Sequence, residues 1–285
     1  MTDIEGSGAY EEIIYEIEGP VATITMNRPD KLNALTDLTQ AEIRHALDIS
    51  ERTKEIVGTV ITGAGRGFCS GVDMGALGDM SKAGSLQKKS HDHLAAEPGN
   101  PDNDPNFKSS PTYFLGLRKP LIAAVNGACA GLGFSYATFC DMRFVDKKAR
   151  FITSFGPRGL IAEHGTSWML PRLVGSSNAL DLLWSSRKMD AEEAFRIGYA
   201  NRICEAGESA IEARNYLRAI AKTSAPISIM VMKKQVYRHL NQELGDAMQE
   251  SNAWMAESVA REDFKEGVAS FIEKRPPKFQ KIKLQ

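Results

Sequence analysis

Residues 121–141, LIAAVNGACAGLGFSYATFCD, constrain the fold of this chain more than any other stretch. They begin with an apolar run, Leu121–Val125, that predicts a buried strand. An Asn-Gly pair ends the run, and a loop of small residues, 128–133, leads into an apolar helix expected at 134–139. This arrangement aims backbone N–H groups and a partial positive charge at one point. That point can hold a phosphate or an oxygen that becomes negative during a reaction. Alternatively, the glycines serve only for close packing.

A second unit of the same kind lies earlier in the chain. The β-branched run 57–62 predicts a strand buried on both faces, and the glycine-rich segment 63–74 follows it. Strands that alternate with helices predict parallel βαβ units, whose ligands lie beyond the C-terminal ends of the strands. Two such loops can each offer one N–H to the same oxygen, which favours an oxyanion hole. The chain has neither GxGxxG nor GxxxxGK[ST], so nucleotide-binding folds lose support.

The composition is that of one large globular unit. The 285 residues carry a net charge of -1, which gives no reason to expect a nucleic-acid or membrane partner. No apolar run reaches the roughly 18 residues of a membrane span, and the acidic N-terminus does not resemble a signal peptide. The cysteines Cys69, Cys129, Cys140 and Cys204 lack metal-ligand spacing. We therefore expect no metal site, reduced and mostly buried thiols, and a cytoplasmic protein.

The rest of the chain predicts strands first and helices later. Residues 10–17 and 21–26 alternate apolar and polar side chains, which predicts a hairpin. Thr36 has the type and position of an N-cap for a helix over 38–52. Residues 75–119 are rich in Gly, Ser, Lys, Asn, Asp and Pro, and we expect an insertion there that is part helical and part mobile and can act as a lid. The helices expected after Gly175 are 177–184, 191–197, 208–222, 227–240, 242–260 and 262–273.

One glutamate is a candidate catalytic residue in the segment that follows the loop at 128–133. Short strands are expected at 141–145 and 149–153, and Glu163 follows where an apolar loop enters a helix expected at 166–170. A carboxylate among apolar neighbours tends to have a raised pKa, which suits a base that works near neutral pH. Alternatively, Glu163 is a helix-terminal acid favoured by the helix dipole. Taken alone, the local pattern favours this second role.

Four segments together resemble the successive signatures of the crotonase, or enoyl-CoA hydratase/isomerase, superfamily. They are NRPDKLNAL (27–35), GAGRGFCSGVDM (63–74), AAVNGACAGLGFSYATFCDMRF (123–144) and GLIAEHGTSWMLPRLVG (159–175). The resemblance extends over residues 10–271. It implies an α/β fold with a crotonase-like spiral of ββα units over residues 1–205, interrupted by the insertion at about 75–119. It also implies a C-terminal helical region, 206–285, that forms a homotrimer or a dimer of trimers, and an acyl-CoA thioester as substrate without a separate cofactor.

The resemblance also assigns site residues by position. The backbone N–H groups of Val72 and Leu132 would form the oxyanion hole, and Leu132 narrows the pocket where the family usually has glycine. The other residues expected to meet coenzyme A or the acyl group are Arg28, Lys31, Leu32, Ala34, Ser70, Asp73, Met74, Gly131, Ser135, Phe155, Phe271 and Lys274. The cations of this set suit the phosphates. The last two residues are expected to reach the coenzyme A of a neighbouring subunit.

Two departures from the family pattern decide the expected chemistry. Hydratases of the family use two glutamates to activate water, and this chain has Ser135 and Phe155 at those positions. Glu163 stands where isomerases of the peroxisomal Δ3,Δ2-enoyl-CoA type carry their single catalytic glutamate. One carboxylate suffices to move a proton from C2 to C4 while the oxyanion hole holds the dienolate. With the family in view, we favour Glu163 as the base, and His164 can tune it, contact substrate or form the pocket wall.

Three functions therefore remain open at this point. The first is a double-bond isomerase of enoyl-CoA thioesters that uses Glu163. The second is a hydratase, or a hydrolase of a cyclic or branched acyl-CoA, that activates water with Glu163 and His164. The third is an acyl-CoA binder without catalysis, which the two missing glutamates also allow. The sequence does not give the acyl group.

Overall fold

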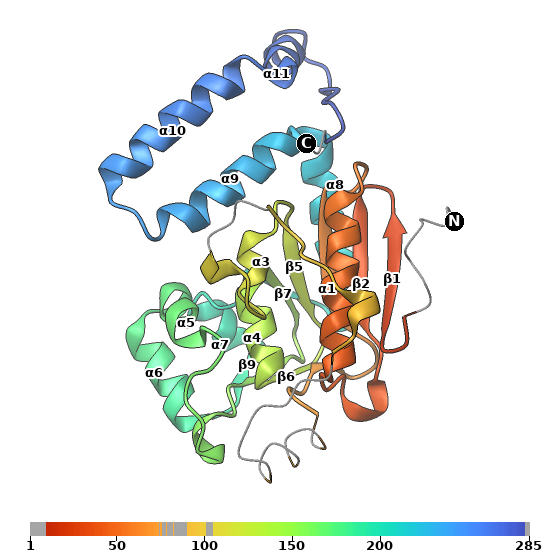
Figure 1. The fold of residues 1–285 in the computed structure, drawn as a ribbon, viewed down its shortest axis with the longest axis vertical. Helices are drawn as coiled ribbons and strands as arrows, with labels where there is room; N and C mark the ends of the chain where they lie inside the picture. Colours follow the sequence, from red (N-terminus) through yellow and green to blue (C-terminus); the bar gives the residue numbers. More distant parts are fainter. Residues whose placement is uncertain are drawn as a thin grey trace.

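The computed structural model describes residues 10–73, 75, 78, 82, 90–100 and 105–282. In this part of the chain the strands form two sheets (Figure 1). The larger sheet has the order β1 (Ile13–Glu18), β2 (Val21–Met26), β3 (Gly58–Gly63), β5 (Leu121–Val125), β7 (Met142–Asp146) and β10 (Arg202–Cys204). The smaller sheet has the order β4 (Gly67–Cys69), β6 (Ala128–Ala130), β8 (Arg150–Ile152) and β9 (Met189–Asp190).

The chain passes from one sheet to the other in a regular way. Strands β1 and β2 form the expected antiparallel hairpin. From β2 onward the larger sheet is parallel. Each of β3, β5 and β7 is followed directly by a strand of the smaller sheet, namely β4, β6 and β8. This repeating path is the α/β spiral of ββα units that the family resemblance implied.

The helices confirm the expected pattern, with small shifts at their ends. They are α1 (Asp37–Arg52), α3 (Tyr113–Gly116), α4 (Leu132–Phe139), α5 (Thr166–Val174), α6 (Ser176–Ser185), α7 (Ala191–Arg196), α8 (Ser209–Thr223), α9 (Pro226–His239), α10 (Leu244–Val259) and α11 (Glu262–Ile272). Short 3-10 helices lie at η1 (Pro29–Lys31), η2 (Asp92–Leu94), η3 (Pro105–Phe107) and η4 (Gly156–Arg158). Within the described ranges, no helix has the length and apolar character needed to cross a bilayer.

Helices cover both faces of the larger sheet, which explains why β3 is buried along its whole length. Leu47 of α1 and Ile61 of β3 belong to one buried cluster. Leu217 of α8 and Val60 of β3 belong to a second cluster. Alternate residues of a strand point to opposite faces, so a strand between two helix layers needs apolar side chains at every position. Each such buried aliphatic side chain contributes about 1.5–3 kcal/mol.

The first helix begins where its capping residue predicts. Thr36 Oγ1 accepts a hydrogen bond from the Thr39 N–H at 3.0 Å, and the Thr36 N–H donates to Thr39 Oγ1 at 3.2 Å. This reciprocal capping box satisfies two backbone donors at the start of α1. Loss of such a cap typically costs about 1 kcal/mol.

Three segments differ from the sequence prediction. Residues 67–69 and 128–130 were expected in loops, but they form β4 and β6. The reason is that β6 pairs with β4 on one side and with β8 on the other. Strand β1 begins at Ile13 rather than at residue 10. The N–H groups of Glu11 and Glu12 instead donate to the Glu42 carboxylate of α1, at 2.7 and 2.9 Å.

The described part of the predicted insertion packs against α1. Arg44 Nε–H donates to the Ala96 carbonyl at 2.7 Å, and the N–H groups of Arg118 and Lys119 donate to the Glu51 carboxylate at 3.0 Å. Helix α3 is buried, so the insertion is part helical, as expected. Met74 and most of residues 76–89 lie outside the described residues, and the expected lid stays a prediction.

Helices α9, α10 and α11 form an arm that extends away from the sheets (Figure 1). The chain then returns to the core, where Ile282 is buried and Lys281 Nζ lies 3.1 Å from Glu55 Oε1. The arm exposes large apolar side chains, including Met232, Val236, Leu244, Met248, Met255, Phe264, Val268, Phe271 and Ile272. Helix α8 packs on the sheet, and α9 is joined to the core because Lys233 Nζ and the Tyr237 hydroxyl both donate to the Asp141 carboxylate at 2.8 Å. The helices that stand apart are therefore α10 and α11. A domain boundary after residue 205 stays a prediction.

Candidate active site

The Val72 N–H is oriented by a short parallel bridge between Leu35 and Val72. The Leu35 N–H donates to the Gly71 carbonyl at 2.7 Å, and the Asp73 N–H donates to the Leu35 carbonyl at 3.0 Å. Successive residues of an extended segment point their N–H groups to opposite sides. The residues on either side of Val72 thus face Leu35, and the Val72 N–H points the other way.

The second N–H group belongs to the first residue of α4, Leu132. The first N–H groups of a helix have no acceptor within the helix, so they are available to an external oxygen. Gly131 precedes them at φ +52 and ψ -123, a conformation that glycine adopts far more readily than other residues. Its own N–H donates to the Ile152 carbonyl at 3.0 Å, which anchors the loop to β8.

The two loops are in direct contact. Gly71 has φ +106, and a Cβ atom at Gly71 would lie 3.5 Å from the Leu132 nitrogen and 3.1 Å from the Ala130 oxygen. A Cβ atom at Gly131 would lie 3.7 Å from the Gly71 Cα atom. The loop of Val72 and the loop of Leu132 therefore lie against each other, as one oxygen shared by their N–H groups would require.

Close packing is a second reason for glycine in this region. A Cβ atom at Gly133 would lie 2.5 Å from the Cys69 carbonyl oxygen, and one at Gly127 would lie 2.1 Å from the Arg66 oxygen. Both positions hold the helix–strand units close to their neighbours. The glycines of these loops therefore serve two purposes. Some permit close packing, and others adopt the backbone conformations that precede the Val72 and Leu132 N–H groups.

The loop that carries Glu163 is joined to α4. The Thr166 N–H donates to the Glu163 carbonyl at 2.9 Å, and the hydroxyl oxygens of Thr166 and Ser135 lie 3.0 Å apart in the buried interior. Ser135 is one turn into α4. This hydrogen bond therefore links the start of α5, and with it Glu163, to the helix whose first N–H belongs to Leu132.

Glu163 is paired with its neighbour rather than enclosed by apolar side chains alone. His164 Nε2 lies 3.2 Å from Glu163 Oε2, and each side chain is about one-third exposed, at 32% and 33%. His164 has φ 55, in the left-handed region. The pair offers one carboxylate and one imidazole, two groups that can exchange a proton.

The positions of the two hydratase glutamates carry no carboxylate. Ser135 is fully buried and hydrogen-bonded to Thr166. Phe155 is buried at the start of η4. Of the three positions at which the resemblance places catalytic carboxylates, only that of Glu163 has one.

The segment expected to bind coenzyme A lies beside the first glycine loop. The Ser70 N–H donates to the Leu32 carbonyl at 3.0 Å, and Ser70 Oγ donates to the Lys31 carbonyl at 3.2 Å. Lys31 itself is exposed. Phe271 belongs to α11, the last helix of the arm, and is 86% exposed. Lys274 follows this helix.

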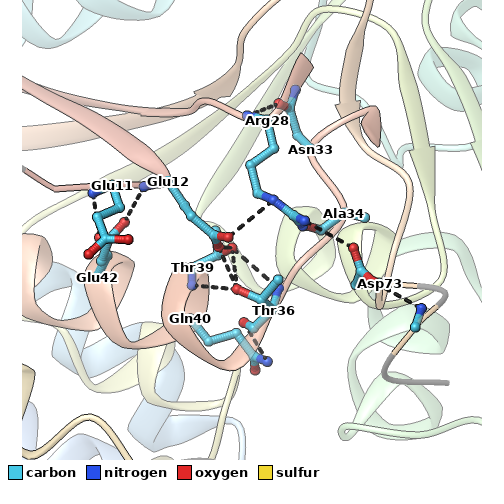
Figure 2. Close-up of polar contacts among 11 residues, drawn as sticks. Glu11, Glu12, Arg28, Asn33, Ala34, Thr36, Thr39, Gln40, Glu42 and Asp73 are labelled. Atoms are coloured by element: carbon cyan, nitrogen blue, oxygen red, sulfur yellow. Dashed lines mark hydrogen bonds and ion pairs between the residues drawn. The ribbon is translucent and has the colours of Figure 1, made fainter. Parts of the chain in front are cut away.

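Arg28 differs from Lys31 because its side chain faces the protein. Figure 2 shows it between Glu12, Ala34 and Asp73. Hydrogen bonds from the Gly75 N–H and then from Arg28 hold the pKa of Asp73 below its usual range. The sequence did not predict the contact of Arg28 with Glu12, because these two residues lie in different segments and neither segment carries a motif that links them.

The cysteines are free thiols and all four are buried, as expected. Burial raises the pKa of the Cys69 thiol to about 12 and that of Cys129 well above its ordinary value. Thiols in this state are poor nucleophiles near neutral pH.

A spiral of ββα units in which two glycine-rich loops lie in contact is characteristic of a crotonase-type protein. Residues 16–282 match the family model described as enoyl-CoA hydratase/isomerase. The chain therefore belongs to the enoyl-CoA hydratase/isomerase family, which acts on acyl-CoA thioesters.

Individual relatives carry both names of the family. A short-chain-enoyl-CoA hydratase of Clostridium acetobutylicum is 31% identical over 92% of this chain and 95% of its own length. A 1,2-epoxyphenylacetyl-CoA isomerase of Escherichia coli is 29% identical over 94% of this chain and 98% of its own. The crystal structure of an enoyl-CoA hydratase/isomerase from Mycobacterium paratuberculosis has a TM-score of 0.81 at 28% identity, over 95% of this chain and 99% of that one.

Proposed function

We propose that this protein is an enoyl-CoA isomerase in which Glu163 moves the proton and the Val72 and Leu132 N–H groups hold the thioester oxygen. The observation that carries the proposal is the set of side chains at the three family positions. Ser135 and Phe155 cannot transfer the protons of water, whereas Glu163 supplies one carboxylate on a loop joined to α4. A single carboxylate is sufficient for a proton shift but not for the paired activation of water.

In the proposed reaction no atom of water enters the product. The Glu163 carboxylate takes a proton from C2 of a 3-enoyl-CoA, and the electron pair of that C–H bond moves into the thioester. The two N–H groups stabilise the oxygen of the resulting dienolate. The Glu163 carboxylic acid then returns the proton to C4, which leaves a 2-enoyl-CoA. One such N–H donor is typically worth about 3 kcal/mol of transition-state stabilisation.

A second candidate function is hydration or hydrolysis of an acyl-CoA. The contact of 3.2 Å between His164 Nε2 and Glu163 Oε2 supports it, because an imidazole can act as the second proton-transfer group. The word hydratase in names such as that of the Clostridium acetobutylicum relative also supports it. A binder without catalysis is the outcome if neither reaction occurs.

We further propose that the arm assembles three chains. Its exposed apolar side chains on α9, α10 and α11 support this, because monomeric proteins rarely expose large contiguous apolar surfaces. Phe271 and Lys274 would then reach the coenzyme A bound to a neighbouring chain. Light scattering of the purified protein should give the mass of three or six chains, and Met255→Asp should lower it. A mass of one chain would contradict the assembly.

The experiment that tests the reaction is a mass-resolved assay with 3-enoyl-CoA and 2-enoyl-CoA. The isomerase predicts conversion of the first into the second without a gain in mass, and loss of this conversion in Glu163→Gln. A product that gains one water would favour the second candidate, and His164→Ala should then abolish it. Tight binding of both thioesters without turnover would indicate a binder.

A further inference from the structure

Arg28 joins three segments that are far apart in the sequence (Figure 2). Its Nε lies 3.2 Å from Glu12 Oε1, before β1. Its Nη1 donates to the Ala34 carbonyl at 2.5 Å, and its Nη2 donates to Asp73 Oδ2 at 3.1 Å. Each nitrogen of the guanidinium thus has one protein acceptor. A planar fork with several donors suits this task, whereas a lysine ammonium is a single point charge.

Two of these contacts lie directly beside the bridge that orients the Val72 N–H. Ala34 precedes Leu35, and Asp73 follows Val72, so Arg28 holds both partners of the Leu35–Val72 bridge. The Leu35–Val72 bridge holds the backbone on both sides of Val72, through the Gly71 carbonyl and the Asp73 N–H. A shift of Ala34 or Asp73 would move this bridge, and the Val72 N–H would move with it. Arg28, which contacts both residues, lies 45 residues before Asp73 in the chain.

The third contact fixes Arg28 itself. The Glu12 carboxylate also accepts hydrogen bonds from the hydroxyl groups of Thr36 and Thr39, the two capping residues of α1. The Arg28 N–H donates to Asn33 Oδ1 at 2.9 Å, which holds the backbone of the loop. The start of α1, Glu12, Arg28 and Asp73 form one continuous polar chain (Figure 2).

We propose that Arg28 is a positioning residue that fixes the Val72 N–H for the thioester oxygen, and that it is not a ligand of the coenzyme A phosphates. This inference rests on the proposed function, because it gives a role to a residue beside the same oxyanion site. The side chain is only about one-fifth exposed and its three nitrogens face protein oxygens. Lys31, in contrast, is exposed and remains suited to the phosphates.

The test uses Arg28→Lys, which keeps the charge and removes the fork. It compares 3-enoyl-CoA with the N-acetylcysteamine thioester of the same acid, which lacks every phosphate. We expect kcat to fall about 10- to 100-fold for both substrates with little change in KM, because a misdirected donor weakens the transition state. A rise in KM for the coenzyme A ester alone would overturn the inference, since it would identify a phosphate ligand.

A spectroscopic measurement separates positioning from loss of stability. A bound 4-(dimethylamino)cinnamoyl-CoA should absorb at longer wavelength when N–H donors polarise its thioester carbonyl. We expect a clear shift with the wild type and a smaller shift with Arg28→Lys at similar Kd. An unchanged shift in the variant would overturn the positioning role of Arg28 but not the proposed function. No shift with the wild type would overturn the oxyanion site, and the proposed function with it.

Two further variants complete the experiment. Asp73→Asn should reproduce the effect of Arg28→Lys, and the double variant should be no worse than either one, because both act through one contact. Arg52→Lys is the matched control, since Arg52 is an exposed arginine paired with Asp48 at 2.9 Å on the far end of α1. It should leave kcat, KM and the spectral shift unchanged. Additive losses in the double variant would contradict a shared role.

Discussion

Replacement of Gly71 by alanine should move the loop of Val72 away from the loop of Leu132. Gly71 has φ +106, a conformation that L-residues rarely adopt, and the new Cβ atom would lie 3.1 Å from the Ala130 oxygen. The backbone strain costs about 1–3 kcal/mol. The contact requires a further shift of a few tenths of an ångström. Because both N–H groups must point at one oxygen, we expect kcat to fall about 10- to 100-fold.

The matched control is Gly19→Ala in the β1–β2 turn. Gly19 also has a positive φ, +61, but a Cβ atom there would meet nothing within 4 Å. Both variants should lower the free energy of unfolding, measured by urea denaturation, and only Gly71→Ala should lower kcat. Wild-type kcat in a folded Gly71→Ala protein would refute the reasoning. An equal loss of kcat in both variants would show that strain alone reduces activity.

Two other predictions concern buried polar groups. Burial lowers the pKa of Lys119 from 10.5 to about 8. Between these two pH values the unfolded chain binds a proton that the folded chain lacks. The contribution of Lys119 to the free energy of unfolding therefore rises by about 3 kcal/mol as the pH rises through this range. The advantage of the wild type over Lys119→Met in denaturant unfolding should therefore grow from pH 8 to pH 10.5, and a constant difference would contradict the shift. Thr166→Val should cost about 1–2 kcal/mol because it removes the partner of the buried Ser135 hydroxyl, and it should lower kcat by loosening the Glu163 loop. The double variant Ser135→Ala with Thr166→Val should recover part of the stability in the same unfolding measurement, and no recovery would mean that the pair does not act through this bond.

The sequence predicts those parts of the fold in which one segment carries its own pattern. Strands β3 and β5 can be predicted because helices cover both faces of the larger sheet, which favours apolar and β-branched residues on both sides of each strand. Helix α1 can be predicted because Thr36, a residue next to it in the sequence, caps its first turn. Strand β6 cannot be predicted from its own residues, because three residues are too few to show an alternation of apolar and polar side chains. Its stability comes from pairing with β4 and β8.

The same distinction applies to the candidate site. The loops of Val72 and Leu132 follow recognisable glycine patterns, and the structure brings them into contact. The partners of Arg28 could not be predicted, because a cation in a turn gives no sign of whether it faces a phosphate or a carboxylate. Its partner Glu12 becomes a neighbour only when β1 and β2 pair. Long-range polar contacts of this kind depend on the complete fold.

The central claim is that Glu163 shifts a double bond without the use of water. The most direct test is the mass of the product formed from 3-enoyl-CoA in H₂¹⁸O by the wild type and by Glu163→Gln. We predict a 2-enoyl-CoA without ¹⁸O from the wild type, and a rate at least about 100-fold lower in the variant. A product that carries ¹⁸O, or an unchanged rate in Glu163→Gln, would contradict the claim.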